Sequence, residues 1–374
     1  MTAHAKLSAS GSHRWLNCPG SIKAEEGIPD GGSIHALEGT RAHNLADLCF
    51  EKDCFADAFL GEEMDGGIID AEMVEHVNGY ISYVREMCRG ADSLESEQRL
   101  DFSRWVPEGF GTSDIVAVKG SQLIIIDLKY GKGVEVSAED NPQLMLYALG
   151  AIDEYDWLGI DSVLMCIYQP RKNNVSEVEM SLGDLLKWAQ WVKAQAQIAV
   201  QDDAPRNPGE KQCQWCKAKA TCPALFEYTQ KVIGAEFDDL DAAENPDALP
   251  VDKLKLVLAS KKLIEGYLSA VEKHAMALAE QNKLPGFKLV EGRSIRRWQD
   301  EEIAVKVLSE QFEETDLFER KFISPTKAEK LVGKKGKSAL SELVVKPRGK
   351  ATLVPEDDKR PAIGDHTDDF ENIS

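Results

Sequence analysis

The segment Gln122–Lys129 constrains the fold of this chain more than any other, because it is a nearly continuous apolar run rich in β-branched residues. A strand with one face in water alternates apolar and polar residues, whereas an unbroken apolar run is typical of a strand buried on both faces. Turn residues flank the run, at Lys119-Gly120 before it and at 131–133 after it. The segment therefore predicts a central strand of a sheet.

The segments around this run complete a mixed pattern. Further strands are predicted at 97–102, 111–118, 162–169 and 175–180, and helices at 36–50, 71–89, 142–152 and 182–200. Pro142 stands in the first turn of its helix, where proline is favoured. The order of these elements predicts an α/β core of roughly four or five strands, flanked by helices.

The chain has 374 residues, more than the ~150 that one domain usually holds. We predict a first domain at 1–233 that contains the sheet, a mostly helical C-terminal domain at 234–345, and a disordered tail at 346–374 that is rich in proline and charge. The sequence has no apolar run of ~18 residues, which excludes a membrane span, and the first residues lack the apolar centre of a secretory signal. A cytoplasmic location is expected.

The formal net charge of −20 argues against a protein that coats nucleic acid without specificity, since lysine and arginine supply the affinity for phosphate. It does not exclude an enzyme that gathers acids around metal ions and binds its substrate along a local basic strip. Net charge informs solubility and steering rather than fold.

Acidic residues stand at the predicted strand ends. Asp127 closes the central strand, and Asp114 lies on the strand before it. If these strands pair as a hairpin through Lys119-Gly120, both carboxylates lie at one end of the sheet, where Mg²⁺ or Mn²⁺ would relieve their repulsion. Lys129 shares a face with Asp127 and could orient water or stabilise charge on a phosphate. By itself, the D-x-K string is more typical of a surface ion pair, because such triplets are common.

Two helical motifs accompany these acids. The first is Gly39-Thr40-x-x-His43, and the second places Gln143 and Tyr147 on one helix face, because they are four residues apart. In order, the chain thus holds G-T-x-x-H, G-x-x-D, D-x-K and Q-x-x-x-Y motifs. This series resembles the RecB-like branch of the PD-(D/E)XK nucleases, over about residues 7–227.

The resemblance implies a restriction-endonuclease-like mixed sheet and Mg²⁺- or Mn²⁺-dependent hydrolysis of DNA. It implies metal ligation by His43, Asp114, Asp127 and the carbonyl of Leu128, catalysis by Lys129, and DNA contacts near the site from Gln143 and Tyr147. Many members have Glu at the position of Asp127, whose shorter side chain would shift the metal by about a bond length. Glu38 is either a further acid near His43 or a solvated acid in the first turn of its helix.

Four of the eight cysteines have the spacing of metal ligands. Cys213-x-x-Cys216 and Cys222 lie close together, and Cys18 is the natural fourth ligand. The spacing leaves zinc and an iron–sulfur cluster equally open. A subset of the RecB-like enzymes holds a [4Fe–4S] cluster with cysteines in this arrangement, and the resemblance therefore favours that cluster. Ligands from both ends of the domain would close a loop of ~200 residues, which stabilises the fold by several kcal/mol. The other cysteines are expected to be small buried hydrophobes.

The resemblance implies an exonuclease of phage-type recombination or repair. Its partner would be DNA, together with a single-strand annealing protein or a helicase, because the sequence holds no helicase motif of its own. The alternative is a non-catalytic nucleic-acid-binding module that keeps the nuclease fold. Retention of His43, Asp114, Asp127 and Lys129 favours the enzyme. The sequence leaves open the polarity of cleavage, the preferred strand and the oligomeric state.

Overall fold

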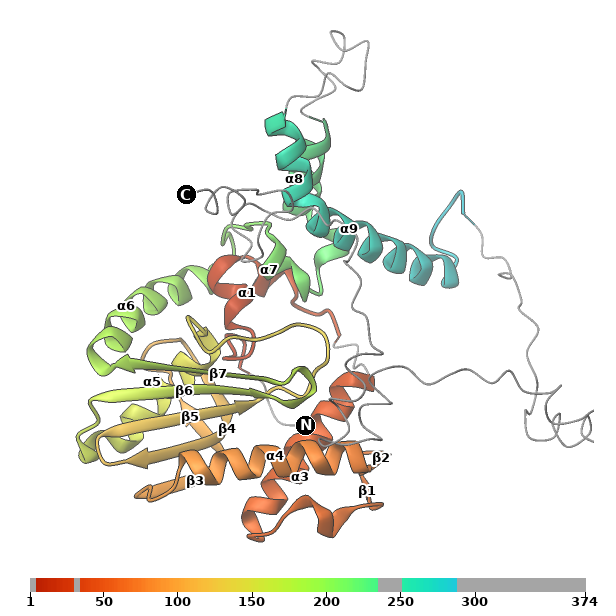
Figure 1. Cartoon of the computed structure of the whole chain (residues 1–374). Helices are drawn as coiled ribbons and strands as arrows, with labels where there is room; N and C mark the ends of the chain where they lie inside the picture. Colours follow the sequence, from red (N-terminus) through yellow and green to blue (C-terminus); the bar gives the residue numbers. More distant parts are fainter. Residues whose placement is uncertain (1–4, 30–33, 235–250, 288–374) are drawn as a thin grey trace, which may run out of the picture. The chain divides into compact units, whose positions relative to one another are not determined.

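A computed structural model describes residues 5–29, 34–234 and 251–287 of the chain. At its centre is a five-stranded mixed sheet with the order β3-β4-β5-β6-β7 (Figure 1). The strands are β3 (Ser93–Asp101), β4 (Phe110–Lys119), β5 (Gln122–Leu128), β6 (Ser162–Gln169) and β7 (Asn174–Ser181). β5 and β6 pair in parallel, and the other neighbours pair antiparallel. The mixed α/β core predicted from the sequence is confirmed.

The central strand β5 is buried on both faces, as its apolar run predicts. Leu123 and Ile125 pack into one core, whereas Ile124, Ile126 and Leu128 pack into the other. β4 and β5 form the predicted hairpin, with Lys119 paired to Gln122 across a turn at Gly120. The register of the hairpin, with Ile115 paired to Ile126, places Asp114 and Asp127 side by side.

Helices cover both faces of the sheet. α3 (Ile34–Glu51) and α4 (Ala71–Met87) pack on one face, and α5 (Pro142–Tyr155) and α6 (Leu182–Ala199) pack on the other. Side-chain caps fix where three of them begin: Asp70 accepts from the backbone of α4, Asn141 from that of α5 and Ser181 from that of α6. α5 also supplies the crossover that the parallel pair β5–β6 requires.

Smaller elements, most of them absent from the sequence prediction, join these layers. They are α1 (Ser12–Asn17), α2 (Ser21–Ala24), η1 (Ala56–Phe59), the hairpin β1 (Glu63–Met64) with β2 (Gly67–Ile68), η2 (Asp156–Leu158) and η3 (Pro170–Lys172). α1 is anchored by Trp15, which is fully buried in the core under α5 and α6 and donates from Nε1 to the carbonyl of Ser8. The N-terminal segment is therefore part of the sheet domain.

The cysteine-rich segment folds into α7 (Glu210–Gln214), η4 (Lys219–Thr221) and α8 (Pro223–Gly234) and packs against α9 (Val251–Glu280). A small separate core joins them, formed by Cys213, Leu225, Leu263 and Tyr267. Gly20 brings the N-terminal segment against this region: its N–H donates to Pro205 O at 2.9 Å, and a Cβ there would lie 2.4 Å from Ala204 O. Any larger residue at position 20 would push the two segments apart.

The chain divides into two compact units, Met1–Pro285 and Gly286–Ser374. α9 thus belongs to the first unit, together with the sheet, whereas the sequence predicts a separate domain that starts at residue 234. The predicted tail at 346–374 and most of the predicted helical domain lie outside the described residues. No helix in the described ranges is long and apolar enough to cross a membrane.

Candidate active site

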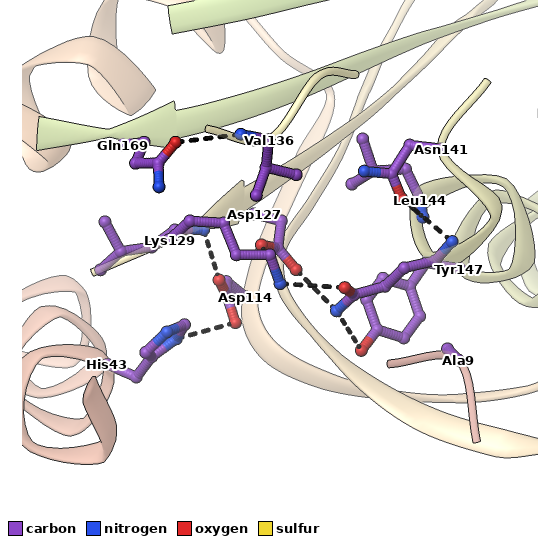
Figure 2. Close-up of polar contacts among 12 residues, drawn as sticks. Ala9, His43, Asp114, Asp127, Lys129, Val136, Asn141, Leu144, Tyr147 and Gln169 are labelled. Atoms are coloured by element: carbon purple, nitrogen blue, oxygen red, sulfur yellow. Dashed lines mark hydrogen bonds and ion pairs between the residues drawn. The ribbon is translucent and has the colours of Figure 1, made fainter. Parts of the chain in front are cut away.

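His43 and Asp114 form the first half of the candidate site. His43 lies on α3 and Asp114 on β4, and His43 Nδ1 is 3.0 Å from Asp114 Oδ1 (Figure 2). The other carboxylate oxygen of Asp114 accepts the backbone N–H of Leu128 at 2.6 Å. Asp114 is thereby held between a helix and the end of the neighbouring strand.

The charges of this pair stabilise each other. Burial alone would lower the pKa of His43, but the Asp114 carboxylate outweighs burial and raises that pKa to about 9. Burial would likewise raise the pKa of Asp114, but His43 and the Leu128 N–H hold it below its ordinary value. Without a bound cation, the site therefore contains an imidazolium and a carboxylate.

Asp127 and Lys129 form the second half. Asp127 is only 2% exposed, and its Oδ2 lies 2.8 Å from Lys129 Nζ. Gln143 of α5 joins both, because its Nε2 donates to Asp127 Oδ1 at 2.9 Å and its Oε1 accepts from Lys129 Nζ at 2.9 Å. The same Nε2 lies 3.2 Å from the hydroxyl oxygen of Tyr147 (Figure 2). The structure thus brings all four of these predicted residues into one hydrogen-bonded group.

The protonation of this second group is also shifted. Burial raises the pKa of Asp127 above its ordinary value, although Lys129 acts in the opposite direction. Burial would lower the pKa of Lys129, but the Asp127 carboxylate keeps it above its ordinary value. Lys129 therefore stays an ammonium group at neutral pH, even inside the protein.

Leu128 and Glu38 have different surroundings from each other. Leu128 lines a small cavity together with His43 and Asp114, next to the residues whose ligation the motif implies. Glu38 instead pairs with Arg171 of η3, at 2.7 Å from Nη1, and the same guanidinium stacks on Tyr130. Glu38 is therefore occupied in joining α3 to the β6–β7 connection, a role that neither interpretation of the sequence included.

The structure adds one residue, Glu97, that the motifs do not mark. It lies on β3, lines the same cavity as His43 and Asp114, and forms with them a group whose ligand atoms all lie within 4.8 Å of one another. Among the residues that the structure describes, no other such group of His, Cys, Asp or Glu is present. Burial and the nearby Asp114 raise the pKa of Glu97 to about 7.

A sequence signal for Glu97 would have required the register of β3 against β4. The observed pairs Ser96–Ile115 and Gln98–Ser113 leave Glu97 directly opposite Asp114. A loop at 102–109 joins the two strands, and a connection of that length does not fix the register as a two-residue turn does.

The four cysteines with ligand spacing line a second small cavity. Cys18 comes from the N-terminal segment, and Cys213, Cys216 and Cys222 come from the region of α7 and η4. Backbone N–H groups of Asn207 and Gly209 donate to the sulfurs of Cys18 and Cys213 at 3.3 and 3.4 Å. Burial raises the pKa of the Cys18, Cys213 and Cys216 thiols. Cys49, Cys88 and Cys166 are buried in the core between the sheet and α3–α4, as expected, whereas Cys54 is only partly buried and packs against that core.

The comparisons with known proteins give a family and three distant structures. The family model described as "Protein of unknown function (DUF2800)" matches residues 4–361. A protein from Eubacterium rectale described as "Putative exonuclease" is similar at 10% identity, over 52% of this chain and 82% of that chain, with a TM-score of 0.31.

Two further structures are similar at 13% identity. SSO0001 matches over 56% of this chain and 95% of its own, with a TM-score of 0.24. Protein VC1899 from Vibrio cholerae matches over 50% of this chain and 56% of its own, with a TM-score of 0.16. Similarities of this size assign no activity to the chain.

Proposed function

The chain belongs to the DUF2800 family, and we propose that it is a metal-dependent nuclease that hydrolyses phosphodiester bonds in DNA. One observation carries the proposal. His43 of α3, Asp114 of β4, and Asp127 and Lys129 at the end of β5 come together, and Gln143 and Tyr147 of α5 join them. Such an assembly of acids, histidine and an ammonium group suits phosphoryl chemistry better than it suits a structural role.

The residues present fit a divalent cation. Asp114 offers carboxylate oxygens and His43 an imidazole nitrogen, a donor set that Mg²⁺ and Mn²⁺ accept. Asp127 Oδ2 is buried and makes no hydrogen bond of normal geometry, although Lys129 Nζ lies 2.8 Å away. The motif adds the Leu128 carbonyl to this set. When bound, the cation would offset negative charge on a phosphate and make water easier to deprotonate.

Lys129 supplies the second positive charge of the proposed site. Asp127 and Gln143 hold its ammonium group at 2.8 and 2.9 Å, so that little reorganisation is needed when charge builds up on a phosphate oxygen. Gln143 is fixed in turn at the capped start of α5, where Asn141 accepts its backbone N–H. Together these contacts support a catalytic role for Lys129 and a positioning role for Gln143.

Tyr147 lies one helical turn beyond Gln143 and offers its hydroxyl at the same site. Gly111 on β4 leaves space for its ring, since a Cβ there would lie 2.9 Å from a ring carbon. A tyrosine hydroxyl next to an amide can donate to a phosphate or to a sugar of the DNA backbone. We infer that Gln143 and Tyr147 contact the strand that is cut.

For the cysteine site we propose a [4Fe–4S] cluster, with zinc as the alternative. In a tetrahedral zinc site the Zn–S distances of about 2.3 Å would place the sulfurs about 3.8 Å apart. No three of the four cysteine sulfurs, all in the described part of the chain, lie within 4.8 Å of one another. Cysteines that bind different irons of a cubane stand farther apart, and the spacing therefore favours the cluster.

The proposed biological role is exonucleolytic processing of DNA in phage-type recombination or repair. Because the sequence holds no helicase motif, the enzyme would act on existing DNA ends, or on ends opened by a helicase, and pass single strands to an annealing protein. The alternative is a nucleic-acid-binding module without catalysis. The ion pair between Lys129 and Asp127 supports the enzyme, because a binding module has no need to bury this pair.

The test is digestion of linear DNA labelled at its 5′ or 3′ end, with Mg²⁺, Mn²⁺ or EDTA. We expect cleavage that requires the cation and that is lost in Lys129→Met. Lys132→Met is the matched control, because Lys132 is a nearby exposed lysine that pairs with Glu72 on the surface. DNA binding without any cleavage under all conditions would favour the non-catalytic alternative.

A further inference from the structure

At Glu97 the backbone of β3 departs from the regular strand conformation, and the alternation of side chains between the two faces of the sheet is reversed. In a regular strand, residues two apart point to the same face of the sheet. Here Ser96 bonds to Asp47 on α3, whereas Gln98 bonds to Glu154 and Tyr155 at the other face. Between them, Glu97 has a φ of +47°, in the left-handed region that non-glycine residues rarely adopt. The strained residue turns its carboxylate toward α3 and His43.

This conformation places two acids face to face. Glu97 stands opposite Asp114, between the pairs Ser96–Ile115 and Gln98–Ser113. Like charges directly opposite each other on neighbouring strands are destabilising. Two features of Glu97 therefore destabilise the fold: its left-handed backbone and its position opposite another carboxylate. Strain of this kind is concentrated at functional sites.

The Glu97 carboxylate has no partner of its own. Within the described residues, no hydrogen bond or ion pair to its side chain is present, and the cavity that it lines also holds His43, Asp114 and Asp47, of which Asp47 already accepts the Ser96 hydroxyl. Asp127, by contrast, is already engaged by Lys129 and Gln143. Glu97, rather than Asp127, is therefore the acid that lines the cavity beside His43 and Asp114.

We propose that Glu97 is a metal ligand, and that Glu97, His43 and Asp114 together hold a divalent cation on the α3 side of the sheet. The inference rests on the proposed nuclease site and adds a ligand that its motifs do not contain. A nitrogen donor beside two carboxylates suits Mn²⁺ at least as well as Mg²⁺. Asp127 holds Lys129 and does not line this cavity, so its replacement by asparagine leaves the three proposed ligands in place.

The test is a titration of the full chain with Mn²⁺, followed by the EPR signal of free Mn²⁺. Glu97→Gln should weaken Mn²⁺ binding by at least about tenfold, whereas Asp127→Asn should retain binding at this position. Glu95→Gln is the matched control, an exposed glutamate two residues earlier on the same strand. Glu97→Gly, which suits the backbone at this position, should show the same loss and thereby exclude misfolding as the cause.

The outcomes separate this inference from the nuclease proposal. Equal Mn²⁺ affinity in Glu97→Gln and Glu95→Gln would overturn the role of Glu97, even if the wild type cuts DNA. A wild type that binds no Mn²⁺ would overturn it as well. A wild type that binds Mn²⁺ through Glu97 but cuts no DNA would support the ligand and remove the nuclease function.

Discussion

The site around Asp114 and Asp127 and the site around the four cysteines both join distant parts of the chain, but the protein holds them in different ways. The acids lie side by side on the paired strands β4 and β5, and their side chains contact His43, Lys129 and Gln143. The cysteine sulfurs accept backbone N–H groups, among them those of Asn207 and Gly209, and border a small core. The first site is built by the sheet, whereas the second would depend on the proposed cofactor.

This difference separates function from stability. Buried side chains that already have partners keep their arrangement when a cation leaves, because the strand ladder and helix caps remain. Four thiols around a cavity lose their common attachment when a cofactor leaves, and Cys18 comes from the far end of the domain. Damage to the first site should therefore affect catalysis first, and damage to the second should affect folding first.

The largest expected effect tests the catalytic side of this comparison. Asp127→Asn removes the charge that fixes Lys129 and should slow DNA hydrolysis by roughly 10²- to 10⁴-fold, since several kcal/mol of transition-state stabilisation are involved. The melting temperature should change little, because asparagine keeps the size of the side chain. Rates on labelled DNA and thermal melts measure both, with exposed Asp161→Asn as the control. Near-normal hydrolysis by Asp127→Asn would show that the site is wrongly assigned.

The next effect tests the cysteine side. Cys213→Ala should remove a ligand and lower the melting temperature by about 10 °C, the shift that a loss of several kcal/mol produces. Cys88→Ala is the control, because Cys88 is buried in another core, between the sheet and α3–α4. Metal analysis of protein purified without oxygen should give about four irons per chain, and tightly bound zinc would select the alternative. Equal melting temperatures in the two variants would contradict a stabilising role for the cysteine site.

A smaller effect concerns the charge pair of the first site in metal-free protein. The pKa of His43 is raised to about 9, so the folded state holds this proton more tightly than the unfolded chain does. Its contribution to stability is therefore complete below pH 6.5 and is lost as the pH rises through about 9. Melts in EDTA should show this fall for the wild type and not for His43→Gln. His13→Gln should keep it, since burial lowers the pKa of His13; a flat wild-type profile would refute the pairing.

The sequence predicted most of the sheet because hydrophobic pattern and turn residues act locally. Each local signal determines one element independently of the rest of the chain. These signals are the apolar run of β5, the short turn at Gly120 and the proline at the start of α5. The order and pairing of β4 and β5 followed from that turn, and with them the shared end of Asp114 and Asp127. For the same reason, residues at motif spacing such as Gln143 and Tyr147 could be placed on one helix face.

The sequence did not predict two features of the site. They depend on contacts between residues far apart in the chain or on unusual backbone geometry. Glu38 pairs with Arg171, which lies far from it in the sequence and belongs to no motif. The position of Glu97 opposite Asp114 depends on a left-handed residue that reverses the alternation of β3. Neither a charge pattern nor a strand period contains that information, because both assume a regular backbone.

The smallest expected effect sharpens the comparison at Glu97 itself. In metal-free protein, Glu97→Gly should raise the free energy of unfolding by about 1 kcal/mol, because it relieves the left-handed backbone and the repulsion from Asp114. The gain is limited by the greater freedom of glycine in the unfolded chain. Glu95→Gly on the same strand should instead destabilise, by roughly 0.5–1 kcal/mol, since its conformation is not left-handed. Urea titrations in EDTA measure both changes.

With saturating Mn²⁺ the wild type should become more stable than Glu97→Gly, because only the wild-type glutamate binds the cation and gains stability from it. A Glu97→Gly variant less stable than wild type in EDTA would show that Glu97 serves the fold rather than the site.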